Sequence, residues 1–299
     1  MDATHLPARS RVALQPGLNF APFAFVLLWS SSFIASRAGL RHLSPLLFVA
    51  VRMVIAAAAL IVLMVVLDRS WRVLAGRWGH LAVSGVLTNS LLLMTAHYAM
   101  VHTGAAQIAL VQTLNPLLTA LLAWPVLGEK LRPLQWLGLL LGATGVLLIV
   151  GMAALRSPVE LHGLLLTVGG VVGLCSGTLY FGRFCRGTPM LEGTTVQFAA
   201  AAVACVVAAI LFETPHAVWN EVSIAALAWN VLAVSLGGMA LYYFMLSHGT
   251  AARAAANFYL VPGTASLLAW VLLGEALSLL TISGLVVSSI GCWLVARRE

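Results

Sequence analysis

Long apolar stretches follow one another along almost the whole chain, and the polar links between them are short. Each stretch is long enough to cross a hydrocarbon layer of about 30 Å as an α-helix. No link could hold a separate domain. The pattern therefore predicts an all-α, polytopic membrane protein. We expect ten spans, at residues 20–37, 45–67, 79–101, 104–127, 133–153, 161–182, 193–212, 223–246, 251–273 and 278–296.

The composition supports this class. The chain has 299 residues, of which 61% are hydrophobic and 8% are charged, whereas ordinary soluble domains are roughly a quarter charged. A polar tail at residues 1–19 precedes the first span. That span is longer than the apolar core of a usual signal sequence, and no convincing cleavage site follows it, so we expect it to remain as a helix.

The basic side chains indicate an orientation. With the amino terminus in the cytoplasm, twelve Lys and Arg residues fall on the inner side, and only Arg37, Arg41 and Arg156 fall on the outer side. The positive-inside rule then places both termini in the cytoplasm of a bacterial cell, with the chain in the inner membrane. The net charge of +7 is an orientation signal rather than a nucleic-acid-binding face, because no soluble domain carries it.

A ten-residue phrase occurs twice, as LLAWPVLGEK ending at Lys130 and as LLAWVLLGEA ending at Ala276, 146 residues later. The same shift aligns, without a gap, Arg37 with Arg183, His102 with His248, Pro116 with Pro262 and Gly145 with Gly291. The spans divide into five-helix repeats at residues 20–156 and 157–299. Because each repeat crosses the membrane an odd number of times, the two must lie antiparallel. Many secondary transporters share this plan and bind their ligand between the halves, around a central cavity.

Several segments resemble the EamA-type drug/metabolite transporter superfamily. They are WSSSF at residues 29–33, the NP pair at 115–116 with the following PVLGEKLRPLQWLGLLLGATGVLLI, and VPGTASLLAWVLLGEALSLLTISGLVVSSIGCWLV. The resemblance covers nearly the whole chain, and general similarity within the superfamily points to YddG-type exporters of aromatic and other neutral amino acids. It implies a ten-helix bundle and export of small solutes, but a fold alone does not name the cargo.

The repeated phrase is typical of a tight helical hairpin. Gly128 and Gly274 can adopt the left-handed conformation that ends a helix, and Glu129 and Glu275 stand where the next span begins. A carboxylate there meets the unpaired N–H groups and the positive end of that helix. We prefer this capping role to a proton-carrying one.

Pro116 and Pro262 fall inside spans four and nine, at equivalent places in the two repeats. A proline inside a helix removes one backbone hydrogen bond and kinks the helix. Two interpretations stay open: the prolines are hinges, or they are fixed kinks that shape the cavity.

Polar and aromatic side chains at mid-membrane depth should face a cavity or one another, because exposure to lipid is costly. On span four, Gln112, Asn115 and Thr119 share one helical face. Hydrogen bonding between helices is the alternative role for such residues. The candidate substrate-binding residues are Trp29, Ser32, Asn89, His97, Tyr98, Gln112, Asn115, Thr119, Tyr180, Tyr242, Tyr243, Asn257 and Thr264.

Two titratable residues inside spans allow two interpretations each. His97 either donates to a substrate carboxylate and titrates near neutral pH, or serves as a structural hydrogen-bonding group, which is the commoner role. Arg52 is the one cation away from the ends of a predicted span, since Arg37 and Arg253 lie at the ends of theirs. Its long side chain either reaches the outer interface or holds a substrate carboxylate, and we favour the interface.

Several groups are missing from the sequence. No Asp or Glu lies near the middle of a predicted span, although proton-coupled pumps commonly use one. We therefore favour a facilitator over coupling through His97 or the substrate. No P-loop, dinucleotide or metal motif is present, and the four cysteines show no CxxC spacing. We expect no catalytic site, no metal and no cofactor.

The leading hypothesis is an inner-membrane exporter of small neutral or zwitterionic metabolites, with aromatic and other neutral amino acids first. One alternative is a proton-coupled multidrug or metabolite exporter of the same superfamily. Another, from a different class, is an intramembrane lipid-handling protein or enzyme, and a third is a passive scaffold. The expected partners are a small-molecule substrate and membrane lipid, without nucleic acid. The oligomeric state stays open, and a monomer is compatible with the sequence.

Overall fold

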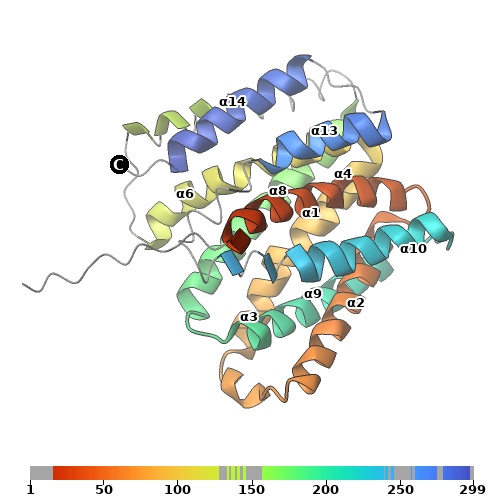
Figure 1. Cartoon of the computed structure of the whole chain (residues 1–299), viewed down its shortest axis with the longest axis vertical. Coiled ribbons are helices and arrows are strands. Elements are labelled where there is room, and N and C mark those ends of the chain that lie inside the picture. The colour runs from red at the N-terminus through yellow and green to blue at the C-terminus, as the bar shows by residue number, and fades with distance from the viewer. Residues whose placement is uncertain are drawn as a thin grey trace, which may run out of the picture.

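A computed structural model gives the arrangement of most of the chain (Figure 1). It describes residues 16–127, 133–134, 136–138, 140–141, 144–145, 157–238, 240–241, 244–245, 257, 260–274 and 279–296. Within these ranges the backbone is helical apart from turns and an isolated antiparallel bridge between Leu43 and Ala217. The elements are α1 (Pro16–Gly39), α2 (Pro45–Val66), η1 (Trp71–Leu74), α3 (Trp78–Gly85), η2 (Val86–Leu91), α4 (Leu92–His102), α5 (Ala105–Val111), α6 (Leu114–Leu127), α8 (Pro158–Phe184), α9 (Met190–Phe212), α10 (Glu221–Ala228), η3 (Trp229–Gly238), α13 (Val261–Leu273) and α14 (Leu279–Ala296).

Six helical stretches of the described residues are long and apolar enough to cross a membrane. They are Phe20–Gly39, Pro45–Val66, Trp78–His102, Pro158–Phe184, Met190–Phe212 and Glu221–Gly238. The helical membrane class predicted from the sequence is therefore confirmed for this part of the chain. Ten spans stay a prediction, because span four is interrupted and much of span five and the start of span nine lie outside the described residues.

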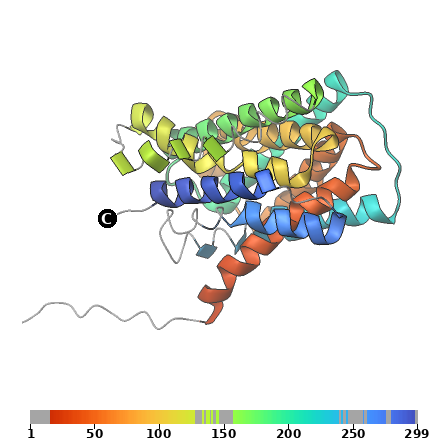
Figure 2. The same cartoon turned by 90° about the horizontal axis from the view of Figure 1, so that it is seen from above.

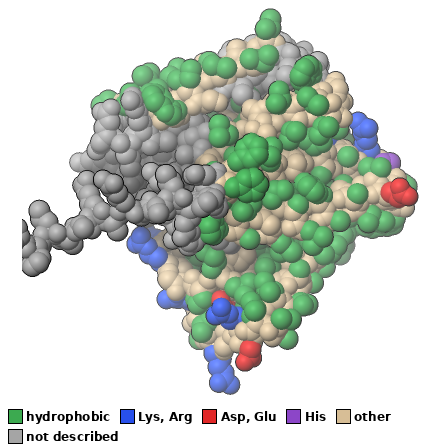
Figure 3. Space-filling model, viewed as in Figure 1, with side chains coloured by type: hydrophobic (Ala, Val, Ile, Leu, Met, Phe, Trp, Pro, Cys, Tyr) green, Lys and Arg blue, Asp and Glu red, His purple; other side chains and the backbone are tan. Residues whose placement is uncertain are grey.

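The helices form a bundle whose surface suits lipid. In Figure 1, α13 and α14 lie at the top and α2 and α9 at the lower right, and Figure 2 shows α1 crossing the others at an angle. Hydrophobic side chains cover the middle of the face in Figure 3, while charged ones gather at its edges. Large apolar side chains such as Val65, Ile210 and Phe212 are exposed. In a bilayer such side chains contact lipid tails rather than water.

The helices α2 and α9 hold equivalent places in the two halves and pack in opposite directions. Met53 of α2 and Cys205 of α9 belong to one buried cluster. Glu213, directly after α9, accepts hydrogen bonds from the backbone N–H groups of Leu46 at 3.2 Å and Leu47 at 2.9 Å, in the first turn of α2. These N–H groups have no acceptor inside the helix, and the carboxylate also meets the positive helix end. The end of α9 thus meets the start of α2, as two inverted repeats require.

Spans three and eight each contain a π-helical segment. Residues 86–91 form η2, and the equivalent residues 232–237 lie within η3. The segment η2 packs against α8, and η3 packs against α1. A π-segment is rare and is frequent at functional sites. The two halves therefore share an irregularity at the same depth of the same span.

The helix α8 approaches α4 and η2 closely through glycines. A Cβ atom on Gly173 would lie 2.9 Å from the Leu91 side chain, and one on Gly177 would be closer still to the η2 segment. Gly173 and Gly177 are four residues apart, the spacing of small residues that lets helices pack closely. Gly169, four residues before Gly173, faces open space, whereas the neighbouring Gly170 makes a close contact.

This difference between neighbouring glycines predicts opposite effects of the same substitution. In Gly170→Ala the new methyl group would overlap Thr95 Oγ1 and would lie 3.0 Å from Leu92 Cα, so we expect a loss of about 1–3 kcal/mol from overpacking. Gly169→Ala is the matched control, and it should match or exceed wild-type stability because alanine favours the helix. Thermal unfolding in detergent, followed by tryptophan fluorescence, checks both variants. Equal midpoints for the two would contradict the packing.

Candidate functional site

Arg52 is the eighth residue of α2 and lies about 10 Å along the helix from its first residue. Its side chain is 5% exposed. Its guanidinium donates from Nη1 to Asn230 Oδ1 at 2.8 Å and from Nε to Ser235 Oγ at 3.1 Å, and both acceptors lie on η3. The expectation that Arg52 reaches the outer interface is wrong, because its head group is held by a neighbouring helix inside the bundle.

Serines of α1 complete this side of the network. Ser32 Oγ donates to Asn230 Oδ1 at 2.7 Å, and Ser36 Oγ lies 3.4 Å from the same oxygen. The two serines are one helical turn apart and so share a face. Asn230 is fully buried, and its Nδ2 donates to Ala226 O at 3.0 Å, which fixes the amide orientation. Donors from α1 and α2 thus converge on one neutral oxygen.

His97 connects the network to α4. Its Nδ1 lies 2.7 Å from Leu93 O, its Nε2 lies 3.0 Å from Ser36 Oγ, and its ring stacks on Phe48 with the centroids 5.5 Å apart. Because a carbonyl only accepts, Nδ1 carries the proton, and Nε2 of the neutral ring accepts from Ser36. Both ring nitrogens therefore have protein partners in this conformation, as the structural role requires.

The charge of Arg52 has no acidic partner among the described residues. The described carboxylates belong to Asp68, Glu160, Glu192, Glu213 and Glu221, all at helix ends. Among the described residues, the guanidinium bonds only to the neutral groups of Asn230 and Ser235, and Nη2 has no hydrogen-bond acceptor there. A buried charge is costly unless it is paired. The network is therefore rich in donors and carries an uncompensated positive charge.

Span four is broken rather than kinked. The helix α5 ends at Val111, a turn at residues 112–113 follows, and α6 begins at Leu114. Pro116 therefore lies in the first turn of a new helix, where its missing N–H removes no helical bond. Pro262 likewise is the second residue of α13. At Pro116 the predicted kink is thus replaced by a break and the start of a separate helix. Most of the residues before Pro262 lie outside the described residues, so a kink or a break there stays a prediction.

The first helix of each half contacts the helix start of the other half. Ser30 Oγ on α1 donates to Val261 O at 3.1 Å, at the first residue of α13. Cys175 Sγ on α8 lies 3.3 Å from Asn115 O, the equivalent position on α6. Thr119 Oγ1 donates to Asn115 Oδ1 at 3.2 Å. Both helix starts are thus held across the boundary between the halves.

Other candidate residues lie away from Arg52. Tyr98 is 37% exposed and contacts His102 edge to face. Tyr180 lies near the end of α8, with its hydroxyl 2.7 Å from His80 Nδ1. Trp29 is half-buried, and its ring centroid lies 5.4 Å from that of Phe25.

Two of the remaining candidates, Asn89 and Thr264, contact groups close to them in the sequence. Asn89 donates from Nδ2 to Thr88 Oγ1 at 3.1 Å, and Thr264 Oγ1 donates to a carbonyl of its own helical turn at 2.9 Å. Asn257 Nδ2 lies 3.6 Å from a methionine sulfur, and Gln112 is half-buried in the turn before α6. Tyr242 and Tyr243 lie outside the described residues. Of the candidates, only Ser32 and His97 belong to the Arg52 network.

Ser36, Asn230 and Ser235 were missed by sequence reasoning. A usable signal was present, since Ser36 follows Ser32 by one helical turn. Ser235 is also the repeat equivalent of Asn89, which was a candidate. In span eight the tyrosines were candidates, whereas the polar residues Asn230 and Ser235 were not.

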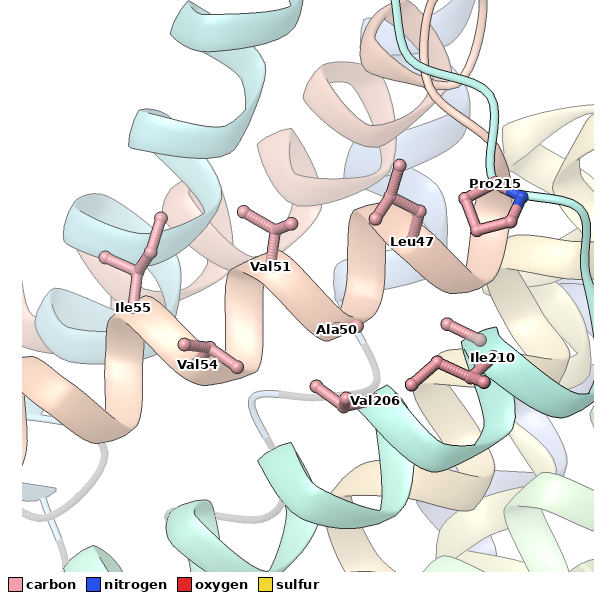
Figure 4. Close-up of a pocket in the computed structure, with 9 residues that line it drawn as sticks. Leu47, Ala50, Val51, Val54, Ile55, Val206, Ile210 and Pro215 are labelled. Carbon is pink, nitrogen blue, oxygen red and sulfur yellow. The ribbon is translucent and has the colours of Figure 1, made fainter.

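An apolar groove lies between α2 and α9 (Figure 4). Side chains such as Leu47, Val54, Val206 and Ile210 line it, together with Pro215. It has a volume of about 230 Å³ and no polar side chain. A site for a polar solute needs a few placed hydrogen-bonding groups, so this groove does not fit one.

The described cysteines are buried and free: Cys175, Cys185 and Cys205. Burial raises the pKa of the Cys185 thiol above its ordinary value, and the nearby Arg77 guanidinium offsets this only in part. These positions are typical of cysteines that serve as small buried side chains.

Comparison with known proteins now decides the family. The model of the EamA-like transporter family matches twice, over residues 17–151 and 161–297. The chain belongs to the EamA-like transporter family. It is similar to the uncharacterized transporter YvbV of Bacillus subtilis, with 25% identity over 277 residues, which are 92% of this chain and 90% of the relative. It is also similar to the uncharacterized inner membrane transporter YedA of Escherichia coli, with 26% identity over 262 residues, 86% of this chain and 83% of the relative.

A solved crystal structure shares the fold, with a TM-score of 0.68 and 22% identity over 93% of this chain and 97% of the other. As an EamA-like protein with these relatives, the chain is a membrane transporter rather than an enzyme. Its substrate is a small molecule, and the names of the relatives do not specify which one.

The helix starts predict a kinetic role for the two prolines. Pro116→Ala restores an N–H, which allows α5 and α6 to join into one helix, and Pro262→Ala acts at the start of α13. Transport should slow by several-fold while the yield of folded protein stays near wild type. Pro45→Ala is the control, because this proline begins α2 after a loop and has no helix directly before it that could join α2. Equal losses of rate and yield would assign both prolines to folding alone.

Proposed function

We propose that this EamA-like transporter exports small zwitterionic or neutral solutes with an apolar side chain, aromatic and other neutral amino acids first, across the bacterial inner membrane. The observation that supports this most is the Arg52 network, a buried set of hydrogen-bonding groups inside an otherwise apolar bundle. Such a setting suits a ligand with one polar end and one apolar end.

The network joins the two halves of the chain. Arg52, Ser32 and His97 come from the first half, whereas Asn230 and Ser235 come from the second. A movement of one half against the other must break and remake these bonds. A solute held among them would then be exposed to one side of the membrane and afterwards to the other.

The proposed mechanism is alternating access between two inverted five-helix repeats, residues 20–156 and 157–299, with both termini in the cytoplasm. The antiparallel packing of α2 and α9 supports the inversion. The π-segments and helix starts at equivalent places support a shared set of conformations in the halves. Inverted-repeat transporters of this kind rock one half against the other around a fixed site.

Facilitation without proton coupling is the favoured mode. All described carboxylates lie at helix ends, so none of them is placed to carry a proton through the middle of the bundle. The competing mode is proton-coupled export, and His97 is the observation that favours it, because its imidazole is bonded to Ser36 of the network.

Counterflow in liposomes tests this function. The purified full-length protein is placed in vesicles loaded with unlabelled phenylalanine, and uptake of labelled phenylalanine, threonine and methionine is followed. We expect transient, saturable accumulation, at the same rate with and without a pH gradient. Vesicles without protein are the control. Acceleration by a gradient would favour the proton-coupled mode, and no exchange of any of the three would contradict amino-acid transport and favour a lipid-handling or scaffold role.

A further inference from the structure

We infer that Arg52 forms a carboxylate-binding subsite in which Asn230 Oδ1 holds the position that a substrate carboxylate oxygen takes. The inference rests on the proposed function for the route by which the substrate arrives, and it adds the chemical group that is recognised. The donors of the subsite are the Arg52 guanidinium and the Ser32 hydroxyl. The Asn230 amide occupies the subsite in this structure, and the substrate displaces it.

The Asn230 amide oxygen does not use all the donors at this place. It accepts from Arg52 Nη1 at 2.8 Å and from Ser32 Oγ at 2.7 Å, which fills its two acceptor sites, while Arg52 Nη2 has no acceptor among the described residues. A carboxylate offers two oxygens with about four acceptor sites and pairs with two guanidinium N–H groups at once. One of its oxygens replaces the amide oxygen of Asn230, and the other accepts a hydrogen bond from Arg52 Nη2.

The charge selects the same ligand. Arg52 is buried as a residue, and within the described part of the chain its guanidinium meets only neutral acceptors. Bringing a carboxylate to it removes an uncompensated buried charge, whereas bringing an ammonium group adds a like charge. The subsite therefore favours a carboxylate over an amine by electrostatics as well as by hydrogen bonding.

The subsite also gives the ligand a direction. The repeat equivalent of Arg52 is Phe198 on α9, an apolar side chain that is 4% exposed. The paired helices α2 and α9 thus carry a cation at one place and a phenyl ring at the equivalent place. A zwitterion with an apolar side chain is held with its carboxylate toward the part of α2 that contains Arg52.

Asn230 lies in a segment suited to moving away. It is the second residue of η3, and a return of this π-segment to α-helical register turns its side chain relative to α1 and α2. The bonds from Ser32 and Arg52 to Asn230 join α1 and α2 of the first half to η3 of the second. Replacing these bonds with bonds to a substrate releases one tie between the halves, which couples binding to the movement that transport needs.

A ligand-binding test addresses the subsite without requiring transport. The full-length protein in detergent is unfolded thermally with 3-phenylpropionate, 3-phenylpropylamine or 3-phenylpropanol, which share one skeleton and differ in the end group. Because a ligand of the folded state stabilises it in proportion to the logarithm of its concentration over Kd, we expect only the carboxylate to raise the unfolding midpoint. Equal shifts with the carboxylate and the amine, or no shift with the carboxylate, would overturn the inference.

Substitutions then locate the binding. Asn230→Asp places a permanent carboxylate against Arg52 and should weaken 3-phenylpropionate binding by at least about tenfold, as should Arg52→Gln. If Arg52 had only a structural role, Asn230→Asp should bind 3-phenylpropionate as well as the wild type does, because this variant keeps Arg52 and gives it an ionised partner. Ser31→Ala is the control, since this neighbouring hydroxyl bonds to Leu28 O and receives the Trp229 indole N–H instead. Should Arg52→Gln not fold, the isosteric Asn230→Asp decides alone.

The subsite and the proposed function fail in different ways. Binding of 3-phenylpropionate that Asn230→Asp abolishes, together with no phenylalanine counterflow by the wild type, would keep the subsite and reject amino-acid transport. Phenylalanine counterflow at the wild-type half-saturating concentration in Asn230→Asp would keep the function and reject the subsite.

Discussion

The helices α2 and α9 meet antiparallel at equivalent places in the two halves, and this contact joins one half to the other. Apolar side chains such as Met53 and Cys205 fill the interface, and the Glu213 carboxylate binds the first turn of α2. In addition, α1 of the first half lies against α13 of the second, and α8 of the second lies against α6 of the first. The two halves therefore interlock, and the first helix of each contacts a helix start of the other.

The low dielectric of the membrane explains why polar groups gather where the halves meet. A hydroxyl, amide or guanidinium facing lipid has no partner, so its position in the bundle is set by the nearest polar side chain. In this protein Arg52 and Ser32 of the first half donate hydrogen bonds to Asn230 of the second half. The same bonds that stabilise the bundle are therefore those that any movement of the halves must exchange.

Features that depend on neighbours in the sequence could be predicted. The apolar runs located the six spans found among the described residues, and Gly274 ends α13 with a left-handed φ of 67°, as the repeated GE phrase suggested. Gly128, Glu129 and Glu275 of that phrase lie outside the described residues. The close contacts of Gly173 and Gly177 also follow from their spacing.

Features that depend on contacts between distant segments were missed or misjudged. The direction of Arg52 is set by Asn230 and Ser235, which lie far along the chain and were not candidates. Proline patterns indicate that a helix is disturbed, but whether it bends or stops at Pro116 depends on the turn before it. The roles of Tyr98 and Tyr180 as substrate contacts stay predictions, since both lie away from the Arg52 network.

The antiparallel relation of the halves is tested most directly by cysteine accessibility at equivalent loops. Ser70 and His216 are both exposed and lie 146 residues apart, after α2 and after α9. Each is replaced by cysteine in a background without the four native cysteines, and spheroplasts are treated with a membrane-impermeant maleimide before and after lysis. The account predicts labelling of His216→Cys in intact spheroplasts and of Ser70→Cys only after lysis. Labelling of both at the same stage would place the two loops on one face of the membrane and would contradict the inverted arrangement.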